Sequence, residues 1–91
     1  MQAQTNEDRI RDFVVKQFPL ARKNGVKPSD KWLETGLLDS LGILDLVHFL
    51  EQEFGVLVSD EELMPENFQS LDAVAAFVRS KQLEAGRQEA V

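Results

Sequence analysis

Apolar residues along this chain recur at intervals of three and four positions, the spacing of one face of an α-helix, and almost nowhere alternate as they would in a β-strand. The first stripe predicts a helix over about residues 6–18, which Pro19 closes. The longest stripe predicts a second helix over Ser40–Phe54, with Gly55 as its C-terminal stop. A last stripe predicts a helix that begins at Ser70. These segments carry most of the apolar pattern, so the chain is predicted to be helical.

The stretches between these helices show no helical stripe. Residues 19–39 contain two prolines and two glycines, and since structureless loops of this length are uncommon in compact domains, we expect apolar side chains to pin this loop. The segment Ser59–Glu62 has the spacing of a capping box, and Pro65 limits the helix that follows to a short one. The sequence predicts an all-α fold: a small four-helix bundle of three longer helices and one short one, with a long loop between helices one and two.

Length and composition favour a single domain. The 91 residues are 43% apolar and include no cysteine, which excludes disulfides, zinc-thiolate sites and cysteine nucleophiles. We expect one domain over residues 1–91, with a core over about 6–82 and a polar C-terminal tail over 83–91 into which the last helix frays after Lys81. No apolar run approaches the roughly 20 residues of a membrane span, and the first residues are charged where a secretory signal would be apolar. We therefore expect a cytoplasmic protein.

Charge is distributed unevenly. Sixteen acids against ten bases give a net charge of -6, yet every lysine and arginine lies before position 32 or after position 78. The stretch between, residues 32–78, carries ten of the acids. This pattern argues against a nucleic-acid-binding protein, which would present a basic patch. Two interpretations remain open: a solvated surface, or a surface that meets basic partner proteins.

The chain offers no catalytic constellation. His48 is the only histidine, so no histidine cluster could bind a metal ion. Ser40 lies eight residues before it on the same predicted helix, about 12 Å along the axis, too far for a nucleophile and its base. Ser40 does stand at a helix N-terminus, where unpaired amides and the helix dipole favour an anion such as phosphate. It could also be a simple helix cap.

A helical wheel of residues 40–54 separates two faces. The predicted core face comprises Ile43, Leu44, Leu46, Val47, Leu50 and Phe54. The opposite face, on the side of Ser40, shows Leu41, Asp45, His48 and Gln52, with Phe49 near the border. This second face is suited to a partner that approaches Ser40 from outside.

Two segments resemble a known family. The run Gly36–Leu41, which contains Asp39-Ser40-Leu41, and the helix end Leu50–Gly55 are similar to those of the acyl carrier proteins and their peptidyl and aminoacyl relatives, and the likeness covers about residues 8–80. The resemblance implies a carrier that is not an enzyme. It implies that Ser40, flanked by Asp39 and Leu41, accepts 4'-phosphopantetheine from coenzyme A through a phosphopantetheinyl transferase, and that the arm holds cargo as a thioester.

The resemblance also implies a docking role for the helix that follows Ser40. Its acids would meet basic patches on partner enzymes, such as adenylate-forming acyl or aminoacyl ligases, acyltransferases or synthases. Trp32 matches a large apolar residue that closes the family's core. The predicted partner-binding residues are Leu41, Asp45, His48, Glu51, Glu53, Glu61 and Glu62. We expect a monomer, and no metal site.

Two features depart from the common fatty-acid carrier. Gly36-Leu37-Leu38 precedes the aspartate, and Gly42 stands where an acid is usual, which resembles D-alanyl and other specialised carriers. Gly42 also lowers helix propensity, which would leave the serine end of the helix more mobile. Bulky residues at the core predict a small or polar cargo held outside the bundle. The alternative function is an acidic helical interaction module without a prosthetic group.

Overall fold

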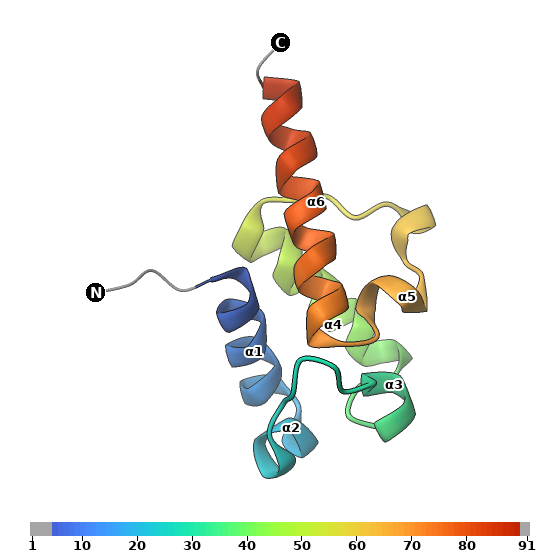
Figure 1. The fold of residues 1–91 in the computed structure, drawn as a ribbon. Helices are drawn as coiled ribbons and strands as arrows, with labels where there is room; N and C mark the ends of the chain where they lie inside the picture. Colours follow the sequence, from blue (N-terminus) through green and yellow to red (C-terminus); the bar gives the residue numbers. More distant parts are fainter. Residues whose placement is uncertain (1–4, 90–91) are drawn as a thin grey trace, which may run out of the picture.

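The computed structural model describes residues 5–89, and these form helices without a β-strand (Figure 1). The expected all-α class is confirmed. Three helices are long and three are short, and a single 3-10 turn, η1, covers Asp60–Glu62. The α-helices are α1 Asn6–Gln17, α2 Pro19–Asn24, α3 Trp32–Thr35, α4 Ser40–Phe54, α5 Pro65–Phe68 and α6 Leu71–Glu89. None of the described helices is long and apolar enough to cross a membrane.

Helix α1 begins and ends for local reasons. Thr5 caps it, since its hydroxyl accepts a hydrogen bond from the Asp8 amide at 3.1 Å while the Asp8 carboxylate accepts one from the Thr5 amide at 3.3 Å. Phe18 is extended, with φ -114° and ψ 116°, as expected of a residue before proline. The helix therefore ends one residue earlier than predicted.

The segment 19–39 is not the plain loop that the sequence predicts, because it contains α2 and α3. Pro19 starts α2 in the first helical position, where its missing amide proton costs nothing. Helix α3 ends at Gly36, whose φ of 77° and ψ of 6° lie in the left-handed region. Helices of four to six residues are too short to show a periodic apolar stripe, which is why the pattern missed them.

The predicted pinning of this segment is confirmed by its contacts. Trp32 and Leu38 are buried in the core. The Trp32 amide donates to the Gln69 carbonyl at 2.7 Å, and the Asp72 amide donates to the Pro28 carbonyl at 3.0 Å. The connection between α2 and α4 is thus attached to the turn between α5 and α6.

The short helix predicted after Ser59 is divided in the structure. The Glu62 carboxylate accepts hydrogen bonds from the Ser59 amide at 3.0 Å and from its hydroxyl at 3.1 Å, but only the η1 turn follows. Pro65 then begins a separate helix, α5, in its first turn. The proline is a helix start here, as it is at Pro19, and not only a stop.

Helix α6 extends further than predicted. The Ser70 hydroxyl accepts a hydrogen bond from the Ala73 amide at 3.2 Å, as expected of a cap. The helix continues to Glu89 through residues of the predicted polar tail, since glutamine, leucine, glutamate and alanine are good helix formers. Residues 90–91 of that tail lie outside the described part of the chain.

The core joins all six helices. Helix α1 packs mainly on α6 and α2, and α5 packs on α6. Leu44, predicted to face the core from α4, is instead 56% exposed because it lies at the edge of the apolar arc. The buried apolar residues are Ile10, Val14, Ala21, Trp32, Leu38, Leu46, Leu50, Val56, Phe68, Leu71, Val74 and Val78.

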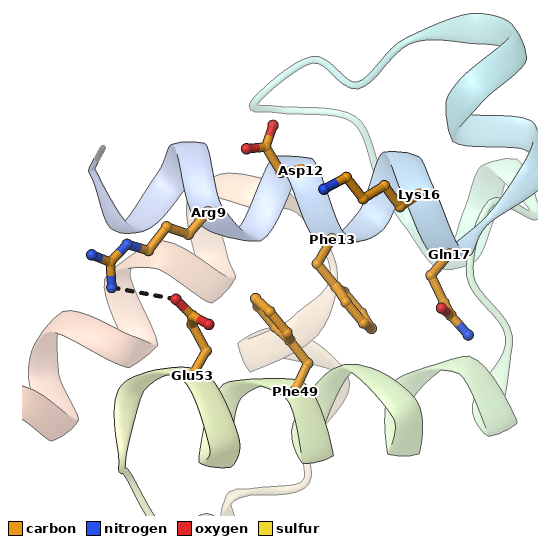
Figure 2. A pocket seen from close by; sticks show the side chains of 7 residues that line it. All are labelled: Arg9, Asp12, Phe13, Lys16, Gln17, Phe49 and Glu53. Atoms are coloured by element: carbon orange, nitrogen blue, oxygen red, sulfur yellow. Dashed lines mark ion pairs between the residues drawn. The ribbon is translucent and has the colours of Figure 1, made fainter. Parts of the chain in front are cut away.

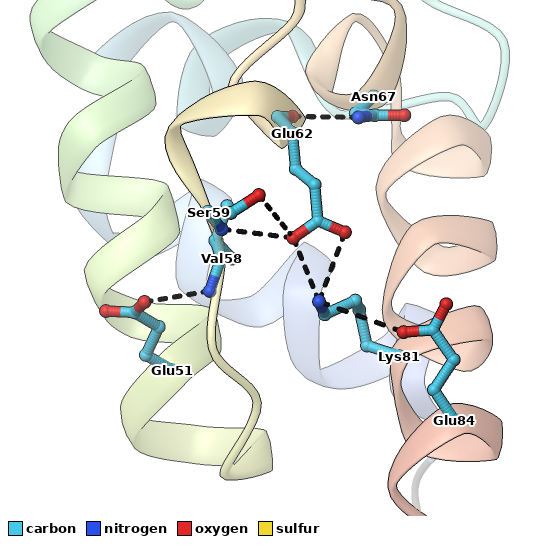
Figure 3. A network of polar contacts seen from close by, with 7 residues as sticks. All are labelled: Glu51, Val58, Ser59, Glu62, Asn67, Lys81 and Glu84. Carbon is cyan, nitrogen blue, oxygen red and sulfur yellow. Dashed lines mark hydrogen bonds and ion pairs between the residues drawn. The ribbon is translucent and has the colours of Figure 1, made fainter.

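Polar contacts tie the segment between α4 and α5 to its neighbours (Figure 3). Lys81 Nζ on α6 lies 2.9 and 3.1 Å from the two carboxylate oxygens of Glu62. Asn67 Nδ2 donates to the Glu62 carbonyl at 2.8 Å. The hydrogen bond from the Ser59 amide and, after it, the bond from Lys81 lower the pKa of Glu62. Glu62 is therefore favoured as a carboxylate in the folded state.

This network predicts a pH-dependent contribution to stability. Because the folded-state pKa of Glu62 is depressed, its stabilisation is present above the unfolded pKa of about 4.3 and is lost as the pH falls through the folded pKa. Glu62→Gln should lower the free energy of unfolding by about 1 kcal/mol at neutral pH, and this difference should shrink as the pH falls below the unfolded pKa. Urea unfolding over this pH range measures the difference. Glu66→Gln, an exposed acid on α5, is the control, and a gap for Glu62→Gln that stays constant with pH would contradict the assignment.

Candidate functional site

The start of α4 is the place where the sequence predicted a modification site. Asp39 is the N-cap, because its carboxylate accepts a hydrogen bond from the Gly42 amide at 2.7 Å. Ser40 is the first helical residue, so the interpretation of Ser40 as the helix cap is wrong. Leu41 follows and is 74% exposed. The N-terminus of α4 is thus capped by Asp39.

The residues before Ser40 are held by the core. The Leu38 amide donates to the Trp32 carbonyl at 3.2 Å, and both side chains are buried. Gly36 allows the chain to turn from α3 toward this buried leucine. Asp39 then takes an extended conformation, with φ -107° and ψ -177°, before the helix begins. The backbone at Ser40 is therefore fixed before the serine by the buried Leu38, and after it by the hydrogen bond from the Gly42 amide to Asp39.

Gly42 has a packing role that its helix propensity does not suggest. A Cβ atom at this position would lie 2.9 Å from Leu38 Cδ1 and 3.0 Å from Phe18 Cε1. Both distances are shorter than normal van der Waals contact. The glycine therefore lets the first turn of α4 pack closely against Leu38 and Phe18, and a larger residue there, an acid included, would disturb this contact.

The electrostatics of this helix start suit a phosphate group. The first turn of α4 contains no acidic side chain, and the Asp39 carboxylate is directed at the Gly42 amide. The N-terminal amides and the dipole of the fifteen-residue helix favour negative charge at this end. Ser40 and its surroundings thus fit a phosphodiester.

The predicted partner-binding residues fall into two groups. Leu41, Asp45, His48 and Glu61 are exposed, and the side chains of these four make no hydrogen bond or ion pair with another described residue. Leu41, Asp45 and His48 share one face of α4, as their spacing of four and three predicts. This face begins immediately beside Ser40.

The other three acids are engaged within the protein. The Glu51 carboxylate accepts a hydrogen bond from the Val58 amide at 3.0 Å (Figure 3). Glu53 forms an ion pair with Arg9 of α1 at 3.4 Å. Glu62 is held by Ser59 and Lys81 as described above. The structure thus gives these carboxylates folding contacts that sequence position alone did not reveal.

An apolar surface beside the exposed face was missed by the sequence analysis. Leu44 of α4 and Met64 before α5 are 56% and 45% exposed, and both line an open cavity of about 280 Å³ between these helices. The pair Leu63-Met64 before Pro65 is the sequence signal that could have indicated it, since both apolar residues lie in a connecting segment and outside the helical stripes.

Comparison with known proteins finds a family match that includes the start of α4. The family described as "Phosphopantetheine attachment site" matches residues 8–78. The chain is 32% identical over 73 residues to "Probable acyl carrier protein PigG" of Serratia sp. (strain ATCC 39006), covering 80% of this chain and 84% of that relative. It is 29% identical over 72 residues to "Acyl carrier protein homolog" of Mycoplasmopsis pulmonis (strain UAB CTIP), covering 79% of this chain and 94% of that relative. The family match runs from α1 into α6 and includes Asp39–Leu41.

The close contacts of Gly42 predict that alanine destabilises the protein there. Alanine would relieve the glycine penalty of up to about 1 kcal/mol, but its Cβ would press on the buried Leu38, and overpacking costs about 1–3 kcal/mol. We expect Gly42→Ala to lose about 1 kcal/mol in net unfolding free energy, measured by urea denaturation. Gln52→Ala, at an exposed position of the same helix, should change stability by less than about 0.5 kcal/mol. A stabilised Gly42→Ala variant would show that Leu38 and Phe18 move aside.

Proposed function

This chain belongs to the acyl carrier protein family with its phosphopantetheine attachment site, and we propose that Ser40 is the residue that carries the prosthetic group. The family's cofactor is 4'-phosphopantetheine, and its members are carriers and not enzymes. When bound, the group supplies a thiol that holds cargo as a thioester. The proposal rests on one observation: Ser40 is the first residue of α4, directly after the capping Asp39, within the matched region.

The residues around Ser40 have separate roles in this proposal. Asp39 caps α4 and so fixes the backbone that presents the serine. The N-terminal amides of α4 favour the phosphodiester through the helix dipole. Leu41, exposed beside the serine, offers an apolar contact to an approaching transferase. The alternative, an acidic interaction module without a prosthetic group, would leave this arrangement without a use.

Intact mass tests the attachment site. Incubation with coenzyme A and a broad-specificity phosphopantetheinyl transferase should add the mass of one phosphopantetheine to the protein and nothing to Ser40→Ala. Because Asp39 supplies the cap, Ser40→Ala should change stability by less than about 0.5 kcal/mol. Ser59→Ala, which loses a hydroxyl bonded to Glu62, is the control and should still be modified. Label that persists in Ser40→Ala would refute the assignment.

We further propose that partner enzymes approach the exposed face of α4. Asp45 and Glu61 are the exposed acids of the predicted set whose side chains have no partner among the described residues, so their charge is available to a basic enzyme surface. Such partners would be the transferase and an adenylate-forming ligase, acyltransferase or synthase that loads the arm. Glu51, Glu53 and Glu62 add to the acidic field while they hold the fold.

Charge reversal at Asp45 tests this docking surface. Asp45→Lys should slow modification of Ser40 by about tenfold at low ionic strength, and the difference should shrink as salt screens exposed charges. Initial rates at several salt concentrations provide the measurement. Glu84→Lys on α6 reverses an exposed acid away from α4 and should leave the rate nearly unchanged. Equal slowing by both variants would favour a general charge effect over docking at Asp45.

We propose a small or polar cargo, held outside the bundle. Trp32, Leu46, Leu50 and Phe68 are fully buried and fill the interior, and the Phe68 and Phe77 rings pack edge to face at 5.3 Å. A long acyl chain would have to displace these side chains or use the open cavity beside Leu44. The cytoplasmic location and the monomeric state expected from the sequence stay predictions.

Thermal stability of loaded forms tests the cargo proposal. Ser40 is charged with phosphopantetheine bearing either an acetyl or a dodecanoyl group, and melting temperature and Trp32 fluorescence are compared with the unloaded arm. A buried chain would gain up to about 0.8 kcal/mol per CH₂ removed from water, so a chain outside the bundle should give nearly equal melting temperatures. Clear stabilisation by dodecanoyl alone would show that the protein encloses a long chain.

A further inference from the structure

A groove runs between α1 and α4, on the side of α4 that faces away from α5. Two cavities, one of about 360 Å³ (Figure 2) and one of about 300 Å³, share the lining residues Phe13, Gln17 and Phe49 and therefore adjoin. The depression reaches from Glu53 to Asp45 along α4, eight residues or about 12 Å of helix. We refer to it as the α1–α4 groove. Its length suits a peptide segment better than a compact small molecule.

The floor of the α1–α4 groove is aromatic. The Phe13 and Phe49 rings stack at 4.2 Å with an interplanar angle of 12°, and Figure 2 shows them meeting between the two helices. Phe18 packs edge-on to Phe13 at 6.2 Å, and Phe54 packs edge-on to Phe49 at 6.1 Å. All four rings are only half buried. Of these rings, Phe13 and Phe49 line both cavities and offer apolar surface that another aromatic side chain could cover.

The rim of the groove carries both signs of charge. No lysine or arginine occurs between residues 32 and 78, so the cations beside this part of α4 come from α1. Arg9 pairs with Glu53 at 3.4 Å and lies 5.9 Å from the Phe54 ring centroid, which closes one end. Lys16 and the acid Asp12, both on α1, are exposed and line this first cavity. Asp45 on α4 is exposed and lines the second cavity, nearer Ser40. This combination of a cation, an apolar floor and an anion can select a segment of complementary charge.

We propose that the α1–α4 groove is a docking site for a protein segment that carries an aromatic side chain between an acidic and a basic residue. The aromatic side chain packs on Phe13 and Phe49, the acid pairs with Lys16, and the base pairs with Asp45. The groove adjoins the helix that begins with Ser40, so a bound segment lies beside the carrier site. The proposal goes beyond the carrier function, and binding does not require a modified Ser40.

The test uses the full chain and a short synthetic amphipathic peptide with one tryptophan, a glutamate one turn before it and an arginine one turn after it. Backbone amide NMR shifts on titration should map to residues 9–17 and 45–53, equally in the Ser40→Ala protein, so the result is independent of phosphopantetheine attachment. A peptide with alanine in place of tryptophan should not bind. Gln17→Trp, at an exposed position shared by both cavities, should block the groove, whereas Lys23→Trp on α2 should not.

Charge exchange makes the assignment specific. Lys16→Glu should weaken peptide binding by about fivefold or more, and a peptide with lysine in place of its glutamate should restore it. Shifts centred on Leu41, Leu44 and Met64, or no binding at millimolar peptide, would overturn the proposal. So would insensitivity to Lys16→Glu. Groove amides that shift when the protein alone is concentrated would assign the groove to a second copy of this chain and overturn it as well.

Discussion

The burial of Trp32 is the constraint on which the position of the candidate site depends. Its side chain is fully buried, its amide binds the Gln69 carbonyl and its carbonyl binds the Leu38 amide. These contacts join the segment before Ser40 to the turn between α5 and α6. Trp32 Nε1 has no hydrogen-bond partner among the described residues, so the residue stabilises the fold through packing and its backbone bonds. The start of α4 is consequently set by the core, although it lies at the surface.

The acidic stretch serves folding and surface charge at once. Glu51 and Glu62 accept backbone amide hydrogen bonds that hold the connection between α4 and α5, and Glu62 also binds Lys81. The carboxylates of Asp45 and Glu61 make no hydrogen bond or ion pair with any described residue. A count of acidic residues in the sequence treats all of these residues as equivalent. The structure instead separates carboxylates that hold a connecting segment from exposed carboxylates that can interact with a basic partner.

Predictions from sequence succeeded where a signal was local and strong. The three longer helices follow from apolar stripes of many residues, and Ser70 caps α6 through a bond to an amide three positions ahead. They failed where helices were short or a residue had two possible roles. Pro19 closes α1 as predicted, but it also begins α2, and Pro65 begins α5. Asp39 rather than Ser40 caps α4. A proline or a capping residue indicates a helix boundary, but the type alone does not say on which side the helix lies.

The sequence by itself determined the helical class, the bounds of α4 and the approximate starts of α1 and α6, because each depends on residues within a few positions of one another. Only the tertiary structure decided that Gly42 packs against Phe18 and Leu38, that Glu62 meets Lys81, and that Phe13 stacks on Phe49 beneath an open groove. Most of these partners are separated by nineteen or more positions along the chain, and such distant contacts depend on how helices pack, which a periodic pattern does not specify.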